Sequence, residues 1–462
     1  MYDFIILLSR YLFFIYIVVF LFCGLVFVVD ERKGLADRIG QLSFIQKCVI
    51  VCMHVTGYLI LSYNRQTSAF DASVMILGLA ALVYFFVSNF LLKSIYKNGC
   101  QLIWNCMYFL MYSGLIMLQR LNPTMASKQL IWITVSTAMM FLIPLILTFL
   151  TKLEKFEFFY FITAIVFVIL PFFLGDKEYG SLNWIKVGSM GFQPSEIVKF
   201  LFLLYIACVF RKSLNLKKLL IVTGFVGFLV LCLVLQKDLG GALIFTITYV
   251  LVLYIATSNI VILLGSAGII SGACIIAYKL FNHVRIRVAT WVNPWTDVGD
   301  TGYQITQSLF AITTWGLWGS GLTRGMPGSI PVVEKDFIFA AICEEMGTFF
   351  GMGIVCIYIL MFVRGMIVAV RAKKRFNSIL AAGIIIMFSF QTFLILGGVI
   401  KLIPLTGVTL PFVSYGGSSV LVSVMLMGLL QHVNEVTKQE PEDEAIEIVV
   451  NNLGSLNRFK TK

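Results

Sequence analysis

The segment Pro331-Val332-Val333-Glu334-Lys335-Asp336 ends a polar stretch that begins near Phe281, and Phe337-Ile338-Phe339-Ala340 then opens a long apolar run. This change predicts that Asp336 lies where a loop meets the mouth of a membrane helix. A carboxylate there is partly in water and partly against a wall of low dielectric constant, which tends to raise its pKa and suits proton transfer or metal binding. Because aspartate is also common at helix N-caps, the position alone leaves a structural role equally open.

The composition around this segment is that of a membrane protein. The chain has 462 residues, of which 59% are hydrophobic and 13% charged, and its mean hydropathy is +0.94. A soluble protein of this size cannot bury so much apolar side chain, and repeated apolar runs of about twenty residues are typical of spanning helices. We therefore expect an all-α polytopic integral membrane protein without a separate soluble domain. The ten cysteines have no metal-ligand spacing and are expected to be apolar fillers.

Thirteen apolar runs are candidates for spanning helices. They lie near 5–29, 45–63, 72–92, 102–118, 129–150, 156–175, 197–210, 219–235, 241–256, 260–280, 337–363, 379–400 and 418–432. The polar, acidic tail that follows from 433 is expected to be a flexible extension.

The distribution of Lys and Arg predicts the orientation of these helices. With the C-terminus placed in the cytoplasm, the cytoplasmic loops carry most of the basic residues, as the positive-inside rule requires. The loop 281–336 is then outside, and the odd number of spans places the N-terminus outside as well. The net charge of +12 comes from basic residues at span ends rather than from a phosphate-binding stripe, so no nucleic-acid partner is expected.

Four polar segments converge on the outer side in this topology. The first, 180–199, ends with Lys199, a charge one turn inside an apolar span, which either snorkels to the surface or serves a buried anion. The second is the tight turn at Lys237 and Asp238. These two residues form either an exposed pair of little energetic value or a structural or ligand contact.

The long loop 281–336 is the third segment, and 401–419 is the fourth. Arg285 and Arg287 alternate with apolar residues, and two guanidinium groups near a bilayer suit a lipid that carries pyrophosphate. The aromatic residues farther along the loop also fit an interfacial belt or an amphipathic segment lying on the membrane. The fourth segment places prolines, glycines and small hydroxyls at membrane depth, where non-helical backbone must be buried in protein or line a wet cavity. We expect a re-entrant segment there, beside a site.

Two further acids follow Asp336 on the same expected helix. Glu344 lies roughly 12 Å below Asp336 if the helix rises about 1.5 Å per residue, and Glu345 is adjacent to it. Acids at that depth are costly unless they are paired or functional. We expect structural partners for both.

The order and spacing of these motifs resemble those of the SEDS family, the FtsW, RodA and SpoVE group of polytopic peptidoglycan glycosyltransferases. The resemblance covers about residues 102–435, and its motifs are Asn183-Trp184-Ile185 with Gln193-Pro194-Ser195-Glu196 and Lys199; Asn293-Pro294-Trp295-Thr296-Asp297 with Gly302-Tyr303-Gln304; Pro331 with Asp336-Phe337-Ile338-Phe339 and Glu344-Glu345; and Pro404-Thr406-Gly407-Thr409-Leu410-Pro411 with Ser414-Tyr415-Gly416-Gly417-Ser418-Ser419. Two positions depart from the family pattern. Asn183 stands where an Arg is usual, which puts one candidate anion contact in doubt, and Val332 stands where many members have Glu.

The resemblance implies a ten-helix transmembrane core, here 96–435, that contains the large extracellular loop 281–336. The three helices expected within 1–95 lie outside this core, and we expect a role in partner docking or regulation for them. The remaining segment, 436–462, would be a cytoplasmic acidic tail.

The resemblance also implies an activity, which is polymerisation of lipid II into glycan strands on the outer face of a bacterial cell membrane, for elongation, division or sporulation. A class B penicillin-binding protein that cross-links the strands and other membrane proteins of the divisome or elongasome would be partners, and a divalent cation, Mg²⁺ or Mn²⁺, would assist. The family's essential acid matches Asp336, as general base or as metal ligand. Candidate substrate contacts, among which the basic residues would hold pyrophosphate, are Lys199, Lys237, Asp238, Arg285, Arg287, Gln304, Ser414 and Ser418.

Two interpretations from other functional classes stay in view. A lipid-linked precursor flippase or transporter also fits many spans with buried charges, but it predicts inverted internal repeats, which the sequence does not show. It also gives no reason for a long outer loop that ends at Asp336. A purely structural scaffold for division proteins would tolerate the loss of Asp336, Arg285 and Arg287 together.

Overall fold

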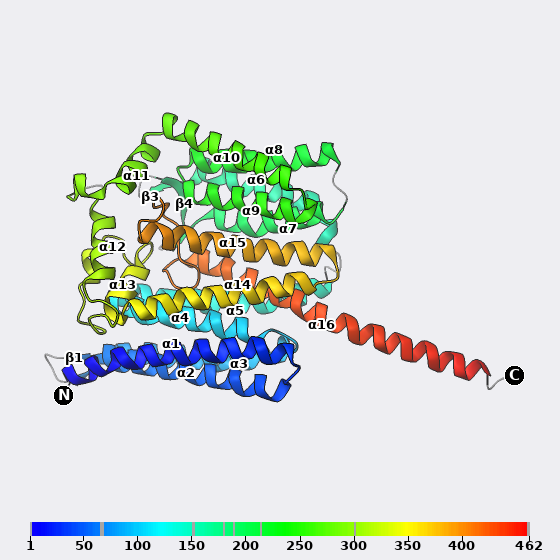
Figure 1. The fold of residues 1–462 in the computed structure, drawn as a ribbon, viewed down its shortest axis with the longest axis horizontal. Coiled ribbons are helices and arrows are strands. Elements are labelled where there is room, and N and C mark those ends of the chain that lie inside the picture. The colour runs from blue at the N-terminus through cyan, green and yellow to red at the C-terminus, as the bar shows by residue number, and fades with distance from the viewer. Residues whose placement is uncertain are drawn as a thin grey trace.

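The computed structural model describes residues 2–64, 69–149, 153–178, 181–187, 190–212, 215–299 and 302–459. Long helices lie side by side across the molecule, and the loops that join them gather at its two ends (Figure 1). Twelve of the described helices are long and apolar enough to cross a membrane. The predicted all-α polytopic membrane fold is therefore confirmed.

Twelve of the thirteen predicted spans each correspond to one helix, although α7 has only 17 residues, and the span 337–363 is divided between two helices. The long helices are α1 (Tyr2–Arg32), α2 (Ala36–Ser62), α3 (Ala72–Ile95), α4 (Gln101–Leu121), α5 (Pro123–Phe149), α6 (Glu157–Leu174), α7 (Pro194–Phe210), α8 (Leu216–Leu235), α9 (Leu239–Thr257), α10 (Ile260–Leu280), α14 (Thr348–Arg371), α15 (Arg375–Val399) and α16 (Gly417–Phe459). Helix α16 continues into the acidic tail and extends away from the bundle (Figure 1), and the flexibility of this tail stays a prediction.

Short elements lie between these helices. They are β1 (Tyr63–Asn64), β2 (Ala69–Phe70), η1 (Leu153–Lys155), β3 (Asp176–Glu178), β4 (Ser181–Val187), β5 (Met190–Phe192), α11 (Asn282–Val292), η2 (Pro294–Asp297), α12 (Tyr303–Thr313), η3 (Pro327–Ser329) and α13 (Ile338–Met346). Strands β3, β4 and β5 form an antiparallel sheet in that order, with Trp184 opposite Asp176 and Ile185 opposite Phe192. The sequence did not indicate this small sheet, because its strands are short and stand in a polar loop.

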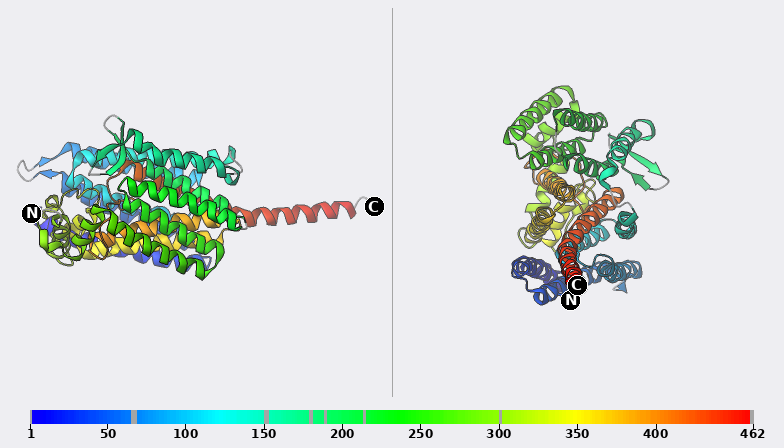
Figure 2. Two further views of the ribbon diagram at one scale, coloured as in Figure 1. Left: turned by 90° about the horizontal axis from the view of Figure 1, so that it is seen from above. Right: turned by 90° about the vertical axis from the view of Figure 1, so that its right-hand side faces the viewer.

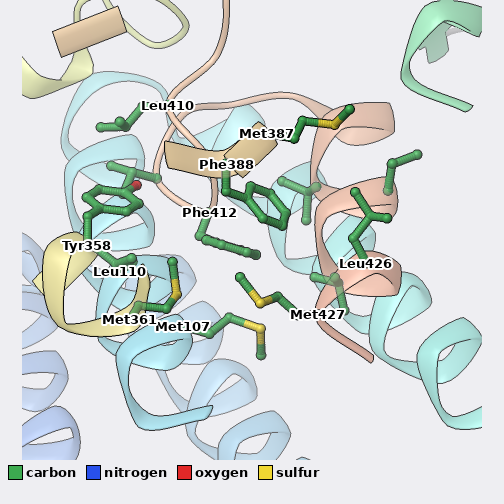
Figure 3. Packing of buried hydrophobic residues seen from close by; sticks show 14 of the residues in the cluster. Met107, Leu110, Tyr358, Met361, Met387, Phe388, Leu410, Phe412, Leu426 and Met427 are labelled. Atoms are coloured by element: carbon green, nitrogen blue, oxygen red, sulfur yellow. The ribbon is translucent and has the colours of Figure 1, made fainter. Parts of the chain in front are cut away.

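The centre of the bundle is helix α4, whose spanning segment is almost completely buried. Around it, side chains from α4, α14, α15, α16 and the loop before α16 interlock (Figure 3), and the labelled ones are Met107, Leu110, Tyr358, Met361, Met387, Phe388, Leu410, Phe412, Leu426 and Met427. Lipid tails are as apolar as these residues, so close packing rather than removal from water stabilises this centre.

The predicted span 337–363 is broken at Gly347, which separates the nine-residue helix α13 from α14. Gly347 has φ 98° and ψ 154°, a backbone conformation that is essentially confined to glycine. A Cβ there would lie 2.5 Å from the Leu317 carbonyl oxygen, so close packing also requires glycine. The expectation that Asp336 opens a spanning helix is therefore wrong in this respect, because the residue precedes a short, buried helix.

The N-terminal helices form a layer along one side of the bundle (Figures 1 and 2). Helix α1 packs against α2 and α14, α2 packs against α4, and α3 packs against α2 and α5. Most of their contacts with the core therefore run through α4, α5 and α14, and α1 also contacts α13.

The predicted polar segments gather at one end of the molecule, called the site end below. It holds β3–β5, α11–α13 and 401–416, and the chain begins there and ends on the opposite side (Figure 1). The predicted convergence of the four segments is confirmed.

Candidate active site

A cavity of about 610 Å³ opens at the site end among the four polar segments. Each segment contributes polar side chains or backbone to its wall. The polar and charged lining residues include Asn183, Gln193, Glu196, Lys199, Lys237, Asp238, His283, Arg287, Gln304, Lys335, Asp336, Thr406 and Thr409. Of the predicted site residues, the cavity brings together Asp336, Lys199, Lys237, Asp238, Arg287 and Gln304.

Asp336 is the acid best placed for chemistry in this cavity. Burial raises its pKa to about 6, and the positive charges of Lys335 and Arg287 offset part of that rise. Within the part of the chain that the structure describes, its carboxylate makes no hydrogen bond. The N-cap of α13 is Phe337, so capping does not explain the acid. A carboxylate with this pKa is largely ionised at neutral pH yet accepts a proton readily.

The turn before Asp336 has a strained backbone. Val332 has φ 57°, which a β-branched residue rarely adopts. Its carbonyl accepts hydrogen bonds from the backbone amides of Lys335 at 3.1 Å and Asp336 at 3.4 Å. This turn places the side chains of Lys335 and Asp336 on the cavity wall, and Val332 is the residue that departs from the pattern of the resembled family.

The segment 401–416 crosses the cavity beside Asp336 as non-helical backbone, as predicted. Gly407 has φ 71°, and a Cβ on it would lie 3.7 Å from Asp336 Oδ2 and 3.9 Å from Arg287 Nη2. Arg287 Nη1 donates a hydrogen bond to the Leu405 carbonyl at 3.0 Å. Burial lowers the pKa of Arg287, and the charges of Asp336 and Asp238 oppose that shift. The loop, the guanidinium and the carboxylate therefore form one local unit.

Three predicted substrate contacts do not line the cavity. Arg285 is exposed on α11, because residues two apart on a helix point in different directions and Arg287 already faces inward. Ser414 Oγ donates to the Lys335 carbonyl and accepts from the Leu410 amide at 3.0 Å, so it fixes the loop to the turn before Asp336. Ser418 is buried in α16.

Lys199 serves a buried anion rather than snorkelling. Its Nζ lies 2.9 Å from Glu196 Oε1, one helical turn away, and 3.2 Å from Gln391 Oε1. Gln391 in turn donates to the Thr409 carbonyl at 2.9 Å. Lys199 therefore supports the wall of the cavity with its charge already paired.

The Asp238 side chain is held by contacts within the protein, whereas its neighbour Lys237 is exposed at the cavity. Asp238 caps α9 by accepting from the Gly241 amide at 2.8 Å. Its second oxygen accepts from Gln193 at 3.2 Å and Asn183 at 3.4 Å. Asn183 thus supports Asp238 at the position where the resembled family usually has an arginine.

Lys335 and His283 also line the cavity, and neither was among the predicted site residues. Lys335 Nζ lies 5.3 Å from the centre of the Trp184 ring, a cation–π contact, and its charge acts on Asp336. The adjacency of Lys335 to Asp336 was an available signal. His283 gave no signal, because a single histidine in a loop indicates no particular contact.

The expected structural partners of Glu344 and Glu345 are present. Glu345 Oε1 pairs with Arg120 at 3.0 Å, and its Oε2 accepts from the Thr323 amide at 3.1 Å. Glu344 Oε1 accepts from the Met326 amide at 2.7 Å. Both acids therefore anchor the loop before Asp336.

The donor set fits a divalent cation only in part. Among the residues that the structure describes, no three or more His, Cys, Asp or Glu side chains are grouped to hold a metal ion. Of the three acids on the wall, Glu196 pairs with Lys199 and Asp238 caps α9. Asp336 remains, and a single carboxylate suits a Mg²⁺ or Mn²⁺ ion that takes its other ligands from substrate phosphate and water.

The chain is similar to proteins of known name. It is 32% identical over 354 residues to the peptidoglycan glycosyltransferase RodA of Mycobacterium tuberculosis (strain ATCC 25618 / H37Rv). This alignment covers 70% of this chain and 75% of that protein. It is 34% identical over 284 residues to the stage V sporulation protein E of Bacillus subtilis (strain 168). This alignment covers 59% of this chain and 76% of that protein.

Solved structures show the same fold for the core. A chain of a peptidoglycan synthase complex superposes with a TM-score of 0.62 at 23% identity, over 74% of this chain and 99% of that chain. The rod shape determining protein RodA of Thermus thermophilus superposes with a TM-score of 0.53 at 22% identity, over 73% of this chain and 96% of that chain.

The part of the chain that carries the cavity also matches a family model. The match spans residues 100–439 and leaves α1–α3 outside it. It includes the turn at Asp336, the α8–α9 turn and the loop before α16. The chain therefore belongs to the FtsW/RodA/SpoVE family of cell cycle proteins.

Proposed function

We propose that this protein is a peptidoglycan glycosyltransferase that polymerises lipid II into glycan strands, for cell elongation, division or sporulation. One observation carries the proposal: the Asp336 carboxylate, with its pKa raised to about 6, faces a cavity that also holds Arg287, Lys237 and Lys335. The names of the M. tuberculosis and other RodA relatives support the same activity. The distribution of Lys and Arg supports a cytoplasmic C-terminus, with the site end on the outer face of the cell membrane.

In the proposed reaction, Asp336 is the general base. It accepts the proton of the acceptor sugar hydroxyl while the hydroxyl oxygen forms a bond to the anomeric carbon of the donor. The bond from that carbon to the lipid pyrophosphate breaks, and the pyrophosphate leaves with the electron pair. The positive charges of Arg287, Lys237 and Lys335 stabilise the growing negative charge.

A divalent cation belongs to the proposal as a substrate-bound ion. As the alternative to the general-base role, Asp336 would be the protein ligand of this ion, and substrate phosphates and water would supply the other ligands. When bound, such an ion acidifies a hydroxyl and neutralises phosphate charge.

We also propose a class B penicillin-binding protein as partner, with other membrane proteins of the elongasome or divisome. The similarity of the core to a chain of a peptidoglycan synthase complex supports an assembly of this kind. A transpeptidase would then cross-link strands on the side of the membrane where the cavity opens.

The test is glycan synthesis from purified lipid II in detergent with Mn²⁺ or Mg²⁺, with and without a cognate class B penicillin-binding protein. We expect polymer from the wild type and a loss of at least about a hundredfold in Asp336→Asn, because an amide cannot accept the proton. Arg285→Ala is the matched control, since Arg285 is exposed away from the cavity.

Equal polymer from the wild type and a folded Asp336→Asn variant would remove this residue from the mechanism. If the wild type made no polymer with its partner present, a lipid-translocation assay in vesicles would test the flippase interpretation instead.

A further inference from the structure

Helix α1 contacts the loop that precedes Asp336, although it lies outside the family match. Arg10 Nη1 donates a hydrogen bond to the Gly319 carbonyl at 2.9 Å. The Trp318 ring lies 5.0 Å from the ring of Tyr11 and 5.1 Å from the ring of Phe14. Phe14 also contacts Phe349 at 5.5 Å, at the start of α14. The site end of α1 therefore holds the segment 318–321 in place.

That segment in turn holds α13. The Ser320 amide donates to the Glu344 carbonyl at 2.8 Å, and the Gly321 amide donates to the Glu345 carbonyl at 2.9 Å. The side chains of the two acids then bind the amides of Met326 and Thr323. Backbone and side-chain hydrogen bonds thus join 320–326 to the last turn of α13.

Close packing leaves this loop little freedom. Gly319 and Gly321 have φ of 73° and 95°, and a Cβ on Gly319 would lie 2.5 Å from the Gly347 amide nitrogen. A Cβ on Gly321 would lie 2.6 Å from the Ile6 side chain of α1. Both glycines permit approaches that any larger residue would prevent.

Asp336 lies two residues before α13, and every residue of that helix is buried. A shift of the loop 318–326 therefore displaces α13, and with it the turn that presents Asp336. We propose that α1 is a positioning element for Asp336, acting through Arg10 and Phe14 on the loop 318–326. The glycan-synthesis part of its test rests on the proposed glycosyltransferase function, whereas the hydrogen-exchange part does not.

The opposite end of α1 offers a matched control. Glu31 pairs with the buried Arg364 at 2.6 Å and with Arg371 at 3.6 Å, both on α14. These ion pairs attach the same helix to the core, but they lie far from the loop 318–326 along α1 and α14 (Figure 1). Loss of Glu31 therefore weakens docking without changing the support of Asp336.

The experiment compares Arg10→Ala, Arg10→Lys and Glu31→Gln in the full-length protein. Hydrogen exchange of the backbone amides of 318–346 is measured first, because it does not depend on activity. We expect faster exchange there in Arg10→Ala and wild-type exchange in Glu31→Gln. Arg10→Lys should recover part of the wild-type protection, because its ammonium group can still donate a hydrogen bond.

Glycan synthesis is then measured with the partner and lipid II. We expect kcat to fall about tenfold in Arg10→Ala with KM nearly unchanged, since displacement of a catalytic group acts on the reacting geometry rather than on binding. Glu31→Gln should keep the wild-type kcat even if its thermal unfolding midpoint falls as much as that of Arg10→Ala.

Equal exchange in Arg10→Ala and the wild type would overturn the inference, as would an equal loss of kcat in Arg10→Ala and Glu31→Gln. An inactive wild type would contradict the proposed function instead. The exchange comparison would still decide whether α1 holds the loop.

Discussion

Asp336 carries a charge that burial makes costly, so its pKa links stability to pH. The folded-state pKa of about 6 lies above the ordinary value of 3.8. Folding therefore favours the protonated form, and the cost of the charge is absent below about pH 4 and grows as the pH rises through 6. The proposed role of Asp336 as a base would therefore come at a cost in stability.

Asp336→Asn should consequently be more stable than the wild type above pH 6. A shift of about two pKa units corresponds to at most about 3 kcal/mol, and we expect a rise of a few degrees in the thermal unfolding midpoint at pH 7.5 in detergent. At pH 4 the two midpoints should coincide. A variant that is less stable than the wild type at pH 7.5 would show that the carboxylate is paired after all.

At the scale of single elements, helix α11 separates two arginines that the sequence could not distinguish. Arg287 faces the cavity and donates to Leu405, whereas Arg285 is exposed. The alternation of charged and apolar residues resembles a strand, but the segment is a helix, so only one of the two points inward.

Arg287→Ala should therefore lower glycan synthesis by about a hundredfold, the typical cost of losing one preorganised charge-stabilising group. Arg285→Ala should stay within about twofold of the wild type. The measurement is the initial rate of glycan synthesis from lipid II for both variants, and circular dichroism checks that each variant is folded. Equal losses in both variants would mean that the substrate also reaches the outer face of α11.

Several elements were predictable from the sequence, and there are physical reasons why the others were not. Apolar runs located the thirteen long helices, because a bilayer sets their length and polarity. The break at Gly347 was not visible, since one glycine inside an apolar run does not disturb its hydropathy. The roles of Ser414 and Ser418 depend on packing between distant segments, which one sequence does not encode locally.

At the scale of the whole molecule, the two ends of the bundle carry different elements. The cavity, the N-terminus and the small sheet lie at one end, and the helical tail extends from the other (Figure 1). The proposed topology places the first of these ends outside the cell.

Cysteine labelling in intact cells tests this orientation. Lys237→Cys at the cavity and Lys438→Cys at the base of the tail both replace exposed residues. A membrane-impermeant maleimide should label the first variant above the wild-type background and the second only after the cells are permeabilised. The reverse pattern would place the cavity in the cytoplasm and contradict synthesis on the outer face.

The glycine that separates α13 from α14 has a mechanical consequence. A spanning helix tilts when the thickness of the bilayer changes. A continuous helix from 338 to 371 would pass that tilt directly to the turn that presents Asp336, whereas the break at Gly347 separates α14 from α13, which is hydrogen-bonded to its loop. The break thus interrupts the direct helical path by which fluctuations of the membrane would reach the proposed base.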